Sequence, residues 1–304
     1  MSTTFSHQSV MESEVLSFFK DAHGKVLVDA TAGGGGHLSL LAKAASMAGI
    51  VIAFDRDPRA HEDDAAGGVA KQYKNIRLFP LPFSHIQNTL QALDIEKIDG
   101  LVCDLGVSSY QLDAKDRGFS FLADAPIDMR MDPTTGISAY EWLAISSEST
   151  IADVLFTLGN ERKSRSIARA IKQKWPIENS TLALAHLILS AIKQKKWSKI
   201  HPATRSFQAL RMAVNHEVEE LRCLLGVLPQ ILAVNGIAVF LSFHSVEDRI
   251  VKNAFKQLSR NKCESDDDPR FEILTKKPLM ASKVEIDANR RARSAKLRAI
   301  KRIS

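Results

Sequence analysis

An apolar strand that runs into a glycine-rich turn and then into a helix constrains this chain more than any other feature. Residues 26–37 read VLVDATAGGGGH, and an apolar, helix-compatible stretch follows at 38–48. Only glycine lets backbone amides approach a ligand closely without a side-chain clash, and the N-terminus of the helix then faces that ligand. The segment therefore predicts a ligand site beside the first strand of an α/β sheet.

A second strand indicates the class of ligand. It ends in Asp55, 20 residues beyond Gly35, where a carboxylate accepts hydrogen bonds from both ribose hydroxyls of a nucleoside. A tight turn with a helix-capping aspartate would explain either feature alone but not their spacing. The dinucleotide fingerprint counted from Gly33 needs a glycine where Leu38 stands. The spacing from Asp29 to the glycines instead suits a methyltransferase turn, although an NAD enzyme would share the turn and the acid.

Short apolar runs alternate with helical stretches over residues 25–110, which is typical of a parallel α/β sheet. A later apolar run belongs to the same sheet and follows a helix that we expect at 218–234. The expected strands are 25–30, 50–55, 76–80, 100–105 and 236–243.

Between about residues 118 and 199 the alternation gives way to helical patterns. The simplest organisation is one α/β domain with a helical insertion. We therefore predict a doubly wound, Rossmann-like sheet formed by residues 1–115 and 212–304, interrupted by a helical domain at 116–211.

Positive charge is concentrated in two segments. The net charge is +6, yet residues 276–304 have a balance of +8 and residues 159–211 a balance of +10, which leaves the remainder near −12. Such clustering is the electrostatic footprint of a polyanion binder, although solvated lysine-rich helices would have the same composition. We expect the basic, helix-compatible tail 290–302 to contact RNA phosphates.

The composition excludes several classes of protein. No run of 18 or more apolar residues occurs and residues 1–10 lack a secretory pattern, so we expect a cytoplasmic protein without a membrane span. Cys103, Cys223 and Cys263 are odd in number and far apart, which fits a reducing compartment rather than a disulfide framework or a zinc knuckle.

Three acids near the start of the predicted insertion raise the question of a metal site. Asp124, Asp128 and Asp132 are conceivable ligands, but the segment lacks the Gly and Glu of a calcium loop. We expect no metal here, and instead an ion-pair network through Arg130.

The end of the fourth strand has the chemistry needed for amine methylation. Strand ends face the ligand crevice in open α/β sheets, and Asp104 stands at this end. The amine of a nucleobase is a poor nucleophile because its lone pair is delocalised into the ring. A hydrogen-bond acceptor beside it holds the amine, favours pyramidalisation and stabilises the positive charge that develops. Cys103 should point away from Asp104 in a regular strand, so we interpret it as a core residue.

These segments together resemble the bacterial ribosomal RNA small-subunit methyltransferase H family, also called MraW. The matching stretches cover nearly the whole chain and include 7–14, 31–37, 53–58, 104–111, 117–121, 128–133, 201–215, 242–252, 289–294 and 297–298. The resemblance implies a class I sheet that binds S-adenosylmethionine and an inserted substrate-recognition domain. The implied reaction is N4-methylation of a cytidine of 16S ribosomal RNA within the small (30S) subunit, in the P-site region of the decoding centre.

The resemblance also implies roles for individual residues. Cofactor contacts are implied for Gly35, Gly36, His37, Asp55, Phe83, Asp104 and Gln111. Catalytic roles are implied for Asp104, Ser108 and His244. Substrate contacts are implied for Arg130, His201, Arg205, Gln208 and Arg211. A homodimer is compatible with the family pattern.

One departure keeps other acceptors open. Other amino-methyltransferases carry Asp/Asn-Pro-Pro-Tyr after the fourth strand, whereas this chain reads DLGV at 104–107 and has no stacking tyrosine there. Another RNA base or a DNA adenine therefore stays an alternative acceptor. An RNA-binding assembly factor without catalysis is a further alternative, which the intact turn, Asp55 and Asp104 make less favourable.

Overall fold

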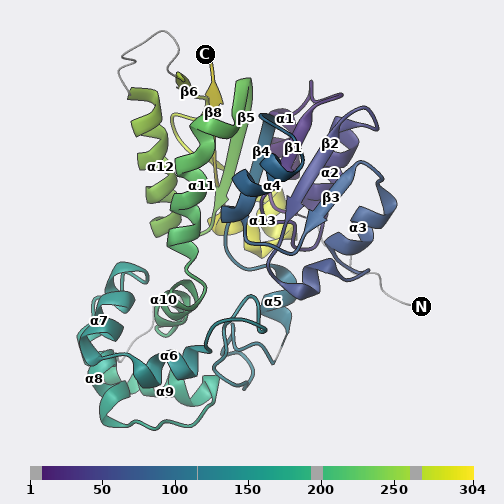
Figure 1. Cartoon of the computed structure of the whole chain (residues 1–304). Helices are drawn as coiled ribbons and strands as arrows, with labels where there is room; N and C mark the ends of the chain where they lie inside the picture. The colour runs from purple at the N-terminus through teal and green to yellow at the C-terminus, as the bar shows by residue number, and fades with distance from the viewer. Residues whose placement is uncertain (1–8, 115, 193–200, 261–268) are drawn as a thin grey trace. The chain divides into compact units, whose positions relative to one another are not determined.

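The computed structural model describes residues 9–114, 116–192, 201–260 and 269–304. The chain divides into two units (Figure 1): an α/β unit within the ranges Met1–Gly106 and Glu219–Ser304, and a helical unit within Val107–Val218. The helical unit extends beyond the predicted insertion 116–211 at both ends. Residues 7–8, which open the first matching stretch, and residues 193–199 of the predicted helical region lie outside the described residues.

The α/β unit is built on one sheet with the strand order β3-β2-β1-β4-β5-β8-β6, and β7 pairs with β8. Strands β1 to β5 run parallel, whereas β8 is antiparallel to β5, β6 and β7. The strands are β1 (Val26–Asp29), β2 (Ile50–Phe54), β3 (Ile76–Phe79), β4 (Ile98–Asp104), β5 (Leu232–Ser242), β6 (Phe271–Ile273), β7 (Leu279–Met280) and β8 (Lys296–Arg302). The order confirms the predicted doubly wound sheet. The antiparallel β8 between β5 and β6 departs from the dinucleotide-binding order 3-2-1-4-5-6.

Alternating side chains of the strands build a core on each face of the sheet. Val102 of β4 belongs to the core under α1 (Glu12–Ser17), α2 (Gly36–Ala45) and α3 (Ala66–Gln72). Its neighbour Cys103 belongs to the opposite core, under α4 (Ile86–Ala92), α11 (Glu217–Ile231) and α12 (Ser245–Arg260). This period of two is what a pleated strand imposes. The interpretation of Cys103 as a fully buried core residue is confirmed.

The helical unit has its own apolar core. It consists of α5 (Ser109–Asp113), α6 (Ala139–Ile145), α7 (Glu148–Thr157), α8 (Ser164–Gln173), α9 (Thr181–Ile192) and α10 (Thr204–Val214). Leu143, Leu155, Ile167, Leu184 and Leu210 from five of these helices are fully buried together. Serines at 138 and 147 start α6 and α7 by accepting a backbone N–H of the first turn, as N-caps do.

The structure corrects the predicted start of the fifth strand. We expected a helix to residue 234, but α11 ends at Ile231 and β5 begins at Leu232. The pairing of β5 with β4 shifts register between Ile98 and Gly100, and Asn235 has a φ of 67° at this irregularity. The Asn-Gly pair therefore marks a bulge inside a strand rather than the end of a helix.

The tail 290–302 is not the helix that its composition allowed. It forms a short 3-10 turn, η3 (Arg290–Ser294), preceded by α13 (Lys283–Ala288), and then β8. Leu297, Ala299 and Ile300 are fully buried in the sheet, so burial overrides the local helical tendency. Of the described helices, none is long and apolar enough to span a membrane.

Candidate functional site

Three aspartates meet at the carboxyl ends of neighbouring strands, and we call Asp29, Asp55 and Asp104 the carboxylate cluster. Asp29 and Asp104 are the last residues of β1 and β4, which pair in parallel, and Asp55 follows β2. The sheet order reverses between β1 and β4, and ligands of doubly wound sheets bind at such a switch point. The cluster therefore lies where a ligand site is expected.

The glycine turn is tied to Asp55. The N–H of Gly33 donates to Oδ2 of Asp55 at 2.8 Å, and the N–H of Asp57 donates to Oδ1 at 2.8 Å. Each carboxylate oxygen has two lone pairs, so each retains one after these bonds. Asp55 can therefore shape the turn and still accept hydrogen bonds from a ligand.

Gly35 and Gly36 both have a packing reason for lacking a side chain. A Cβ on Gly35 would lie 2.6 Å from Cγ2 of Val69, and Gly35 has a φ of +84°. A Cβ on Gly36 would lie 1.7 Å from Oγ of Ser9. No described side chain caps α2. The N–H groups of its first turn, next to the glycine turn, are therefore available to bind a ligand.

Asp104 is held by two neighbours at the edge of the sheet. Its N–H donates to Oγ1 of Thr31 at 2.7 Å, and its Oδ2 lies 3.6 Å from Nδ1 of His37. His37 is buried, and its Nε2 lies 2.9 Å from the carbonyl oxygen of Val10. Because a carbonyl only accepts, Nε2 carries a proton and donates it there. The imidazole thus has a fixed orientation beside Asp104.

Two carboxylate oxygens of the cluster are buried without a hydrogen-bond partner among the described residues. They are Oδ2 of Asp29 and Oδ1 of Asp104. Oδ1 of Asp29 accepts the N–H of Thr31 at 3.0 Å, so its carboxylate is only half satisfied. Unsatisfied buried polar atoms are rare in native proteins and call for an explanation, such as a ligand.

Burial disfavours the charged forms of all three aspartates. It raises the pKa of Asp104 to about 7, and the negative charge of Glu247 adds to the rise. Burial likewise raises the pKa of Asp29 to about 6 against the opposing effects of His37 and the Thr31 amide. The pKa of Asp55 is also raised, mainly by burial. A cluster of this kind is stabilised by a proton or by a cationic ligand, and such perturbed groups concentrate at functional sites.

His244 contacts Glu247, which the sequence did not single out by itself. Nε2 of His244 lies 2.7 Å from Oε1 of Glu247, although the angle is not that of a hydrogen bond. Nδ1 of His244 accepts the N–H of Glu247 at 3.4 Å, in the first turn of α12. Glu247 is buried and also accepts the N–H of Phe243 at 3.1 Å. The sequence feature from which Glu247 could have been predicted is an acidic residue in the first turn of the helix that follows β5.

Phe83 follows β3 in the 3-10 turn η2 (Phe83–His85). Its ring is partly buried against the core under α4 and α11. The next residue, Ser84, donates its N–H and its hydroxyl to the two carboxylate oxygens of Glu220 at 3.2 and 3.0 Å. These bonds fix the turn that carries Phe83.

Ser108 and Gln111 belong to the helical unit and form a capping box at the start of α5. Oγ of Ser108 accepts the N–H of Gln111 at 3.3 Å, and Oε1 of Gln111 accepts the N–H of Ser108 at 2.9 Å. Both side chains therefore have a local structural role. Their predicted catalytic and cofactor roles remain predictions.

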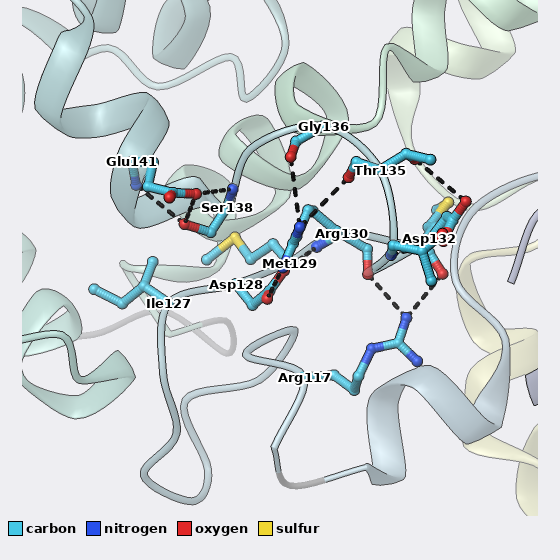
Figure 2. A network of polar contacts seen from close by, with 12 residues as sticks. Arg117, Ile127, Asp128, Met129, Arg130, Asp132, Thr135, Gly136, Ser138 and Glu141 are labelled. Atoms are coloured by element: carbon cyan, nitrogen blue, oxygen red, sulfur yellow. Dashed lines mark hydrogen bonds and ion pairs between the residues drawn. The ribbon is translucent and has the colours of Figure 1, made fainter. Parts of the chain in front are cut away.

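Arg130 is the centre of the expected ion-pair network (Figure 2), which is confirmed. Its Nε and Nη2 donate to the two carboxylate oxygens of Asp128, both at 2.8 Å. Nη2 of Arg117 donates to the carbonyl oxygens of Arg130 and Met131 at 2.9 and 2.8 Å. Asp128 thus already binds two of the donor nitrogens of Arg130, whose guanidinium we predicted to contact substrate.

The three acids that we considered as metal ligands have separate partners. Asp128 binds Arg130, Asp124 accepts the hydroxyl of Ser180 at 2.6 Å, and Asp132 accepts that of Thr134 at 2.6 Å. Among the described residues, no group of three or more His, Cys, Asp or Glu side chains is placed to hold a metal ion.

Polar residues recur at helical spacing along α10 and at its C-cap, and we call Thr204, Gln208, Arg211 and Asn215 the polar stripe of α10. Gln208 and Arg211 have partners within the helical unit. Nε and Nη2 of Arg211 donate to the two carboxylate oxygens of Glu217 at 2.7 and 2.8 Å. Nε2 of Gln208 donates to the carbonyl oxygen of Leu158 at 3.4 Å. The ring of His201 packs on Phe121 with 4.6 Å between centroids. These contacts leave little of the three side chains for a substrate.

Arg205 differs from the other predicted substrate residues. It is exposed, and its side chain makes no hydrogen bond or ion pair with any described residue. Asn215, at the end of the same stripe, has a structural role instead. It accepts the N–H of Met131 at 2.6 Å and donates to the carbonyl oxygen of Met129 at 2.7 Å.

Solved structures to which this chain is similar include an rRNA methylase from Streptococcus thermophilus. The likeness has a TM-score of 0.40 and 12% identity, and it covers 96% of this chain and 95% of that one. Fibrillarin from Aeropyrum pernix with natively bound S-adenosyl-L-methionine matches with a TM-score of 0.41 and 9% identity, covering 95% of this chain and 74% of that one.

Relatives found by sequence share a far higher identity with this chain. A protein from Geobacter sulfurreducens named ribosomal RNA small subunit methyltransferase H is 42% identical over 312 residues, which is 99% of this chain and 100% of the relative. A protein of the same name from Wolbachia sp. subsp. Drosophila simulans is 43% identical over 303 residues, covering 98% and 100%. The sequence pattern of the MraW methylase family matches residues 4–303. The chain therefore belongs to the MraW methylase family.

Proposed function

We propose that this methyltransferase uses S-adenosylmethionine to methylate N4 of a cytidine in 16S ribosomal RNA. The target would lie in the small (30S) subunit, in the P-site region of the decoding centre, and the enzyme would act in the cytoplasm. The names and near-complete coverage of the relatives support a small-subunit rRNA substrate. The observation that carries the chemistry is Oδ1 of Asp104, a buried acceptor without a partner among the described residues, at the end of β4.

The residues of the α/β unit fit the methyl donor. S-adenosylmethionine is cationic at its sulfonium and ammonium groups, and the carboxylate cluster combines raised pKa values with two unpartnered oxygens. Asp55 retains lone pairs that can accept the ribose hydroxyls. When bound, the donor supplies an activated methyl group on a positively charged sulfur.

The remaining cofactor contacts follow from the same placement. Gly35 and Gly36 would present the amides of the first turn of α2, His37 would orient Asp104, and Phe83 would stack on adenine. Gln111, which is in the helical unit, would hydrogen-bond near the donor.

Asp104 would act as the acceptor for the target amine. Its carboxylate holds one N–H of the amine and favours the pyramidal geometry that exposes the nitrogen lone pair. As the N–C bond formed, the bond between the methyl group and the donor sulfur would break and leave a neutral thioether, and the positively charged nitrogen would pass its extra proton to Asp104. A pKa of about 7 suits a base that works near neutral pH. Glu247 raises the basicity of Asp104, and His244, held against Glu247, would contact the target nucleotide.

The helical unit would recognise the RNA. The insertion 116–211 supplies the predicted substrate residues, of which Arg205 is the exposed cation without a described partner. Arg130, His201, Gln208 and Arg211 would act by shaping this unit. Ser108 would fix the start of α5 beside the segment that follows Asp104. Association of two copies is compatible with this function.

The test uses purified protein, labelled S-adenosylmethionine and small subunits from a strain that lacks the modification. Digestion of the RNA and mass spectrometry of the nucleosides should identify N4-methylcytidine, and Asp104→Asn should yield none. Label in another nucleoside would refute the cytosine assignment and support a different acceptor. The absence of label with the unaltered protein, in subunits that a control methylase modifies, would refute the proposal.

A further inference from the structure

A cavity of about 340 Å³ lies where α7 ends and α8 begins. Side chains of both helices and of the connection between them line it, and all of them belong to the helical unit. Its volume is within the range of ligand sites in proteins. It contains none of the carboxylate cluster, so it is separate from the proposed methyl-transfer site.

The cavity is lined by three cations that the fold does not use. The side chains of Arg162, Lys163 and Arg165 are exposed and make no hydrogen bond or ion pair with any described residue. The acid among the lining residues is Asp153, so the lining has an excess of positive charge. Cations that neutralise no partner in the fold are available to neutralise a polyanion.

The hydroxyl of a largely buried serine opens into the same cavity. Ser164 lines it as the first residue of α8, and only 6% of its surface is exposed. Its Oγ has no hydrogen-bond partner among the described residues. The side chain of the N-cap residue Lys163 does not cap α8, and the N–H of Lys163 donates to Oε1 of the buried Glu161 at 2.7 Å. The positive end of a helix, an unpartnered hydroxyl and three cations are the groups that bind a phosphate.

An exposed aromatic ring completes the lining. Phe156 of α7 is 58% exposed, although large apolar side chains of a folded unit are ordinarily buried. Proteins that bind single-stranded nucleic acids combine cations along the backbone with aromatic rings on which the bases stack. Phe156 provides such a ring beside the phosphate-binding groups.

We propose that this cavity binds single-stranded RNA, with a phosphate at the N-terminus of α8 and a base on Phe156. The inference rests on the proposed function in one respect, that RNA is the substrate. It adds a contact outside the methyl-transfer site, through which the enzyme would grip the RNA that surrounds its target.

The experiment measures binding of a short fluorescein-labelled single-stranded RNA by fluorescence anisotropy over a series of KCl concentrations. Replacing Arg162, Lys163 and Arg165 together by alanine should lower the slope of log affinity against log salt by about 2, at roughly 0.7 per phosphate contact. Lys163→Ala should account for part of that change. Its matched control is Lys174→Ala, which removes an exposed lysine without a described partner at the other end of α8.

Two further variants test the groups that are not charged. Phe156→Leu should weaken RNA binding at least about fivefold with little change in salt slope, because base stacking is not electrostatic. Ser164→Ala should weaken binding while the melting temperature stays that of the unaltered protein, since its hydroxyl has no partner to lose within the described fold. Circular dichroism melts of every variant confirm that the helical unit is folded.

Three results would overturn the inference. These are an unchanged salt slope in the triple variant, equal losses in Lys163→Ala and Lys174→Ala, or unaltered affinity in Phe156→Leu. Methyl transfer to small subunits, measured in parallel with the unaltered protein, separates this inference from the proposed function. Transfer with no change in RNA binding by the variants refutes the cavity alone. Loss of RNA binding by the variants, with no transfer by the unaltered protein, refutes the proposed function alone.

Discussion

Replacing Asp104 by asparagine should stabilise the α/β unit above neutral pH while it abolishes methyl transfer. Burial first, and the charge of Glu247 second, raise the pKa of Asp104 from 3.8 to about 7. The folded chain therefore keeps this proton to a higher pH than the unfolded chain does. The contribution of Asp104 to stability is most favourable below pH 3.8 and is lost as the pH rises to about 7.

The magnitude follows from the same window of pH. At about 1.4 kcal/mol per pH unit, Asp104 lowers the free energy of unfolding by up to about 4 kcal/mol at pH 8 relative to pH 4. Solvent reduces this figure, because 25% of the side chain is exposed. Asparagine has nearly the same shape and no charge, so the variant should escape most of this loss. We expect it to exceed the unaltered protein by about 2 kcal/mol or more at pH 8.

The assay has to observe the correct unit. Trp142 and Trp175 are described residues of the helical unit, so their fluorescence reports on that unit. Hydrogen exchange of β1 and β4 amides, followed by mass spectrometry at matched pH values, reports on the α/β unit instead. Asp21→Asn removes an exposed carboxylate from the same unit and is the control.

Two independent results would contradict the role assigned to Asp104. If Asp104→Asn and the unaltered protein lose protection in parallel between pH 5 and pH 8, Asp104 does not carry the charge penalty assigned to it. If the variant transfers methyl groups at a normal rate, Asp104 is not the acceptor. In the unaltered protein, kcat/KM should rise with pH and level off above about 7, because the ionised form is required.

Three further predictions concern the turn, the sheet and the helical unit. Asp55→Ala should weaken binding of S-adenosylmethionine by about 1–3 kcal/mol in calorimetry. Asp55→Asn can still accept the Gly33 N–H and should lose less binding free energy. If Asp55→Ala binds as tightly as the unaltered protein, Asp55 is not part of the site. Truncation before β8 should leave the α/β unit unfolded by circular dichroism, because it removes three fully buried side chains from the sheet; a folded truncated protein would contradict this. Arg211→Ala should destabilise the helical unit by about 3 kcal/mol in urea unfolding followed by tryptophan fluorescence, because it leaves the largely buried carboxylate of Glu217 without its ion-pair partner. Arg205→Ala should change the stability little.

Local patterns predicted the features of the fold that depend on neighbouring residues. The glycine turn, the aspartate after β2, the aspartate that ends β4 and the four N-terminal parallel strands each leave a short signal, because strand, turn and helix follow one another directly. The carboxyl ends of parallel strands share an edge, so the meeting of Asp55 and Asp104 there could be predicted as well.

Features that depend on distant partners could not be predicted. The polar stripe of α10 gave no indication that Glu217, beyond the end of the helix, would neutralise Arg211. Glu247 affects Asp104 only because β4 and β5 pair side by side. The basic tail forms a strand because Leu297, Ala299 and Ile300 are buried in the sheet. Nε of Arg298, in the same strand, also pairs with Oδ1 of Asp248 at 2.7 Å.

The antiparallel strand β8 has a consequence for how the chain is made. β5 emerges from the ribosome well before the residues that cover its outer edge, so until 296–302 have been synthesised its backbone N–H and C=O groups on that side lack their native partner. An open edge of apolar sheet is a template for pairing with another chain. Nascent α/β units therefore pass through a period in which they are prone to associate, while the helices encoded between β4 and β5 are already complete.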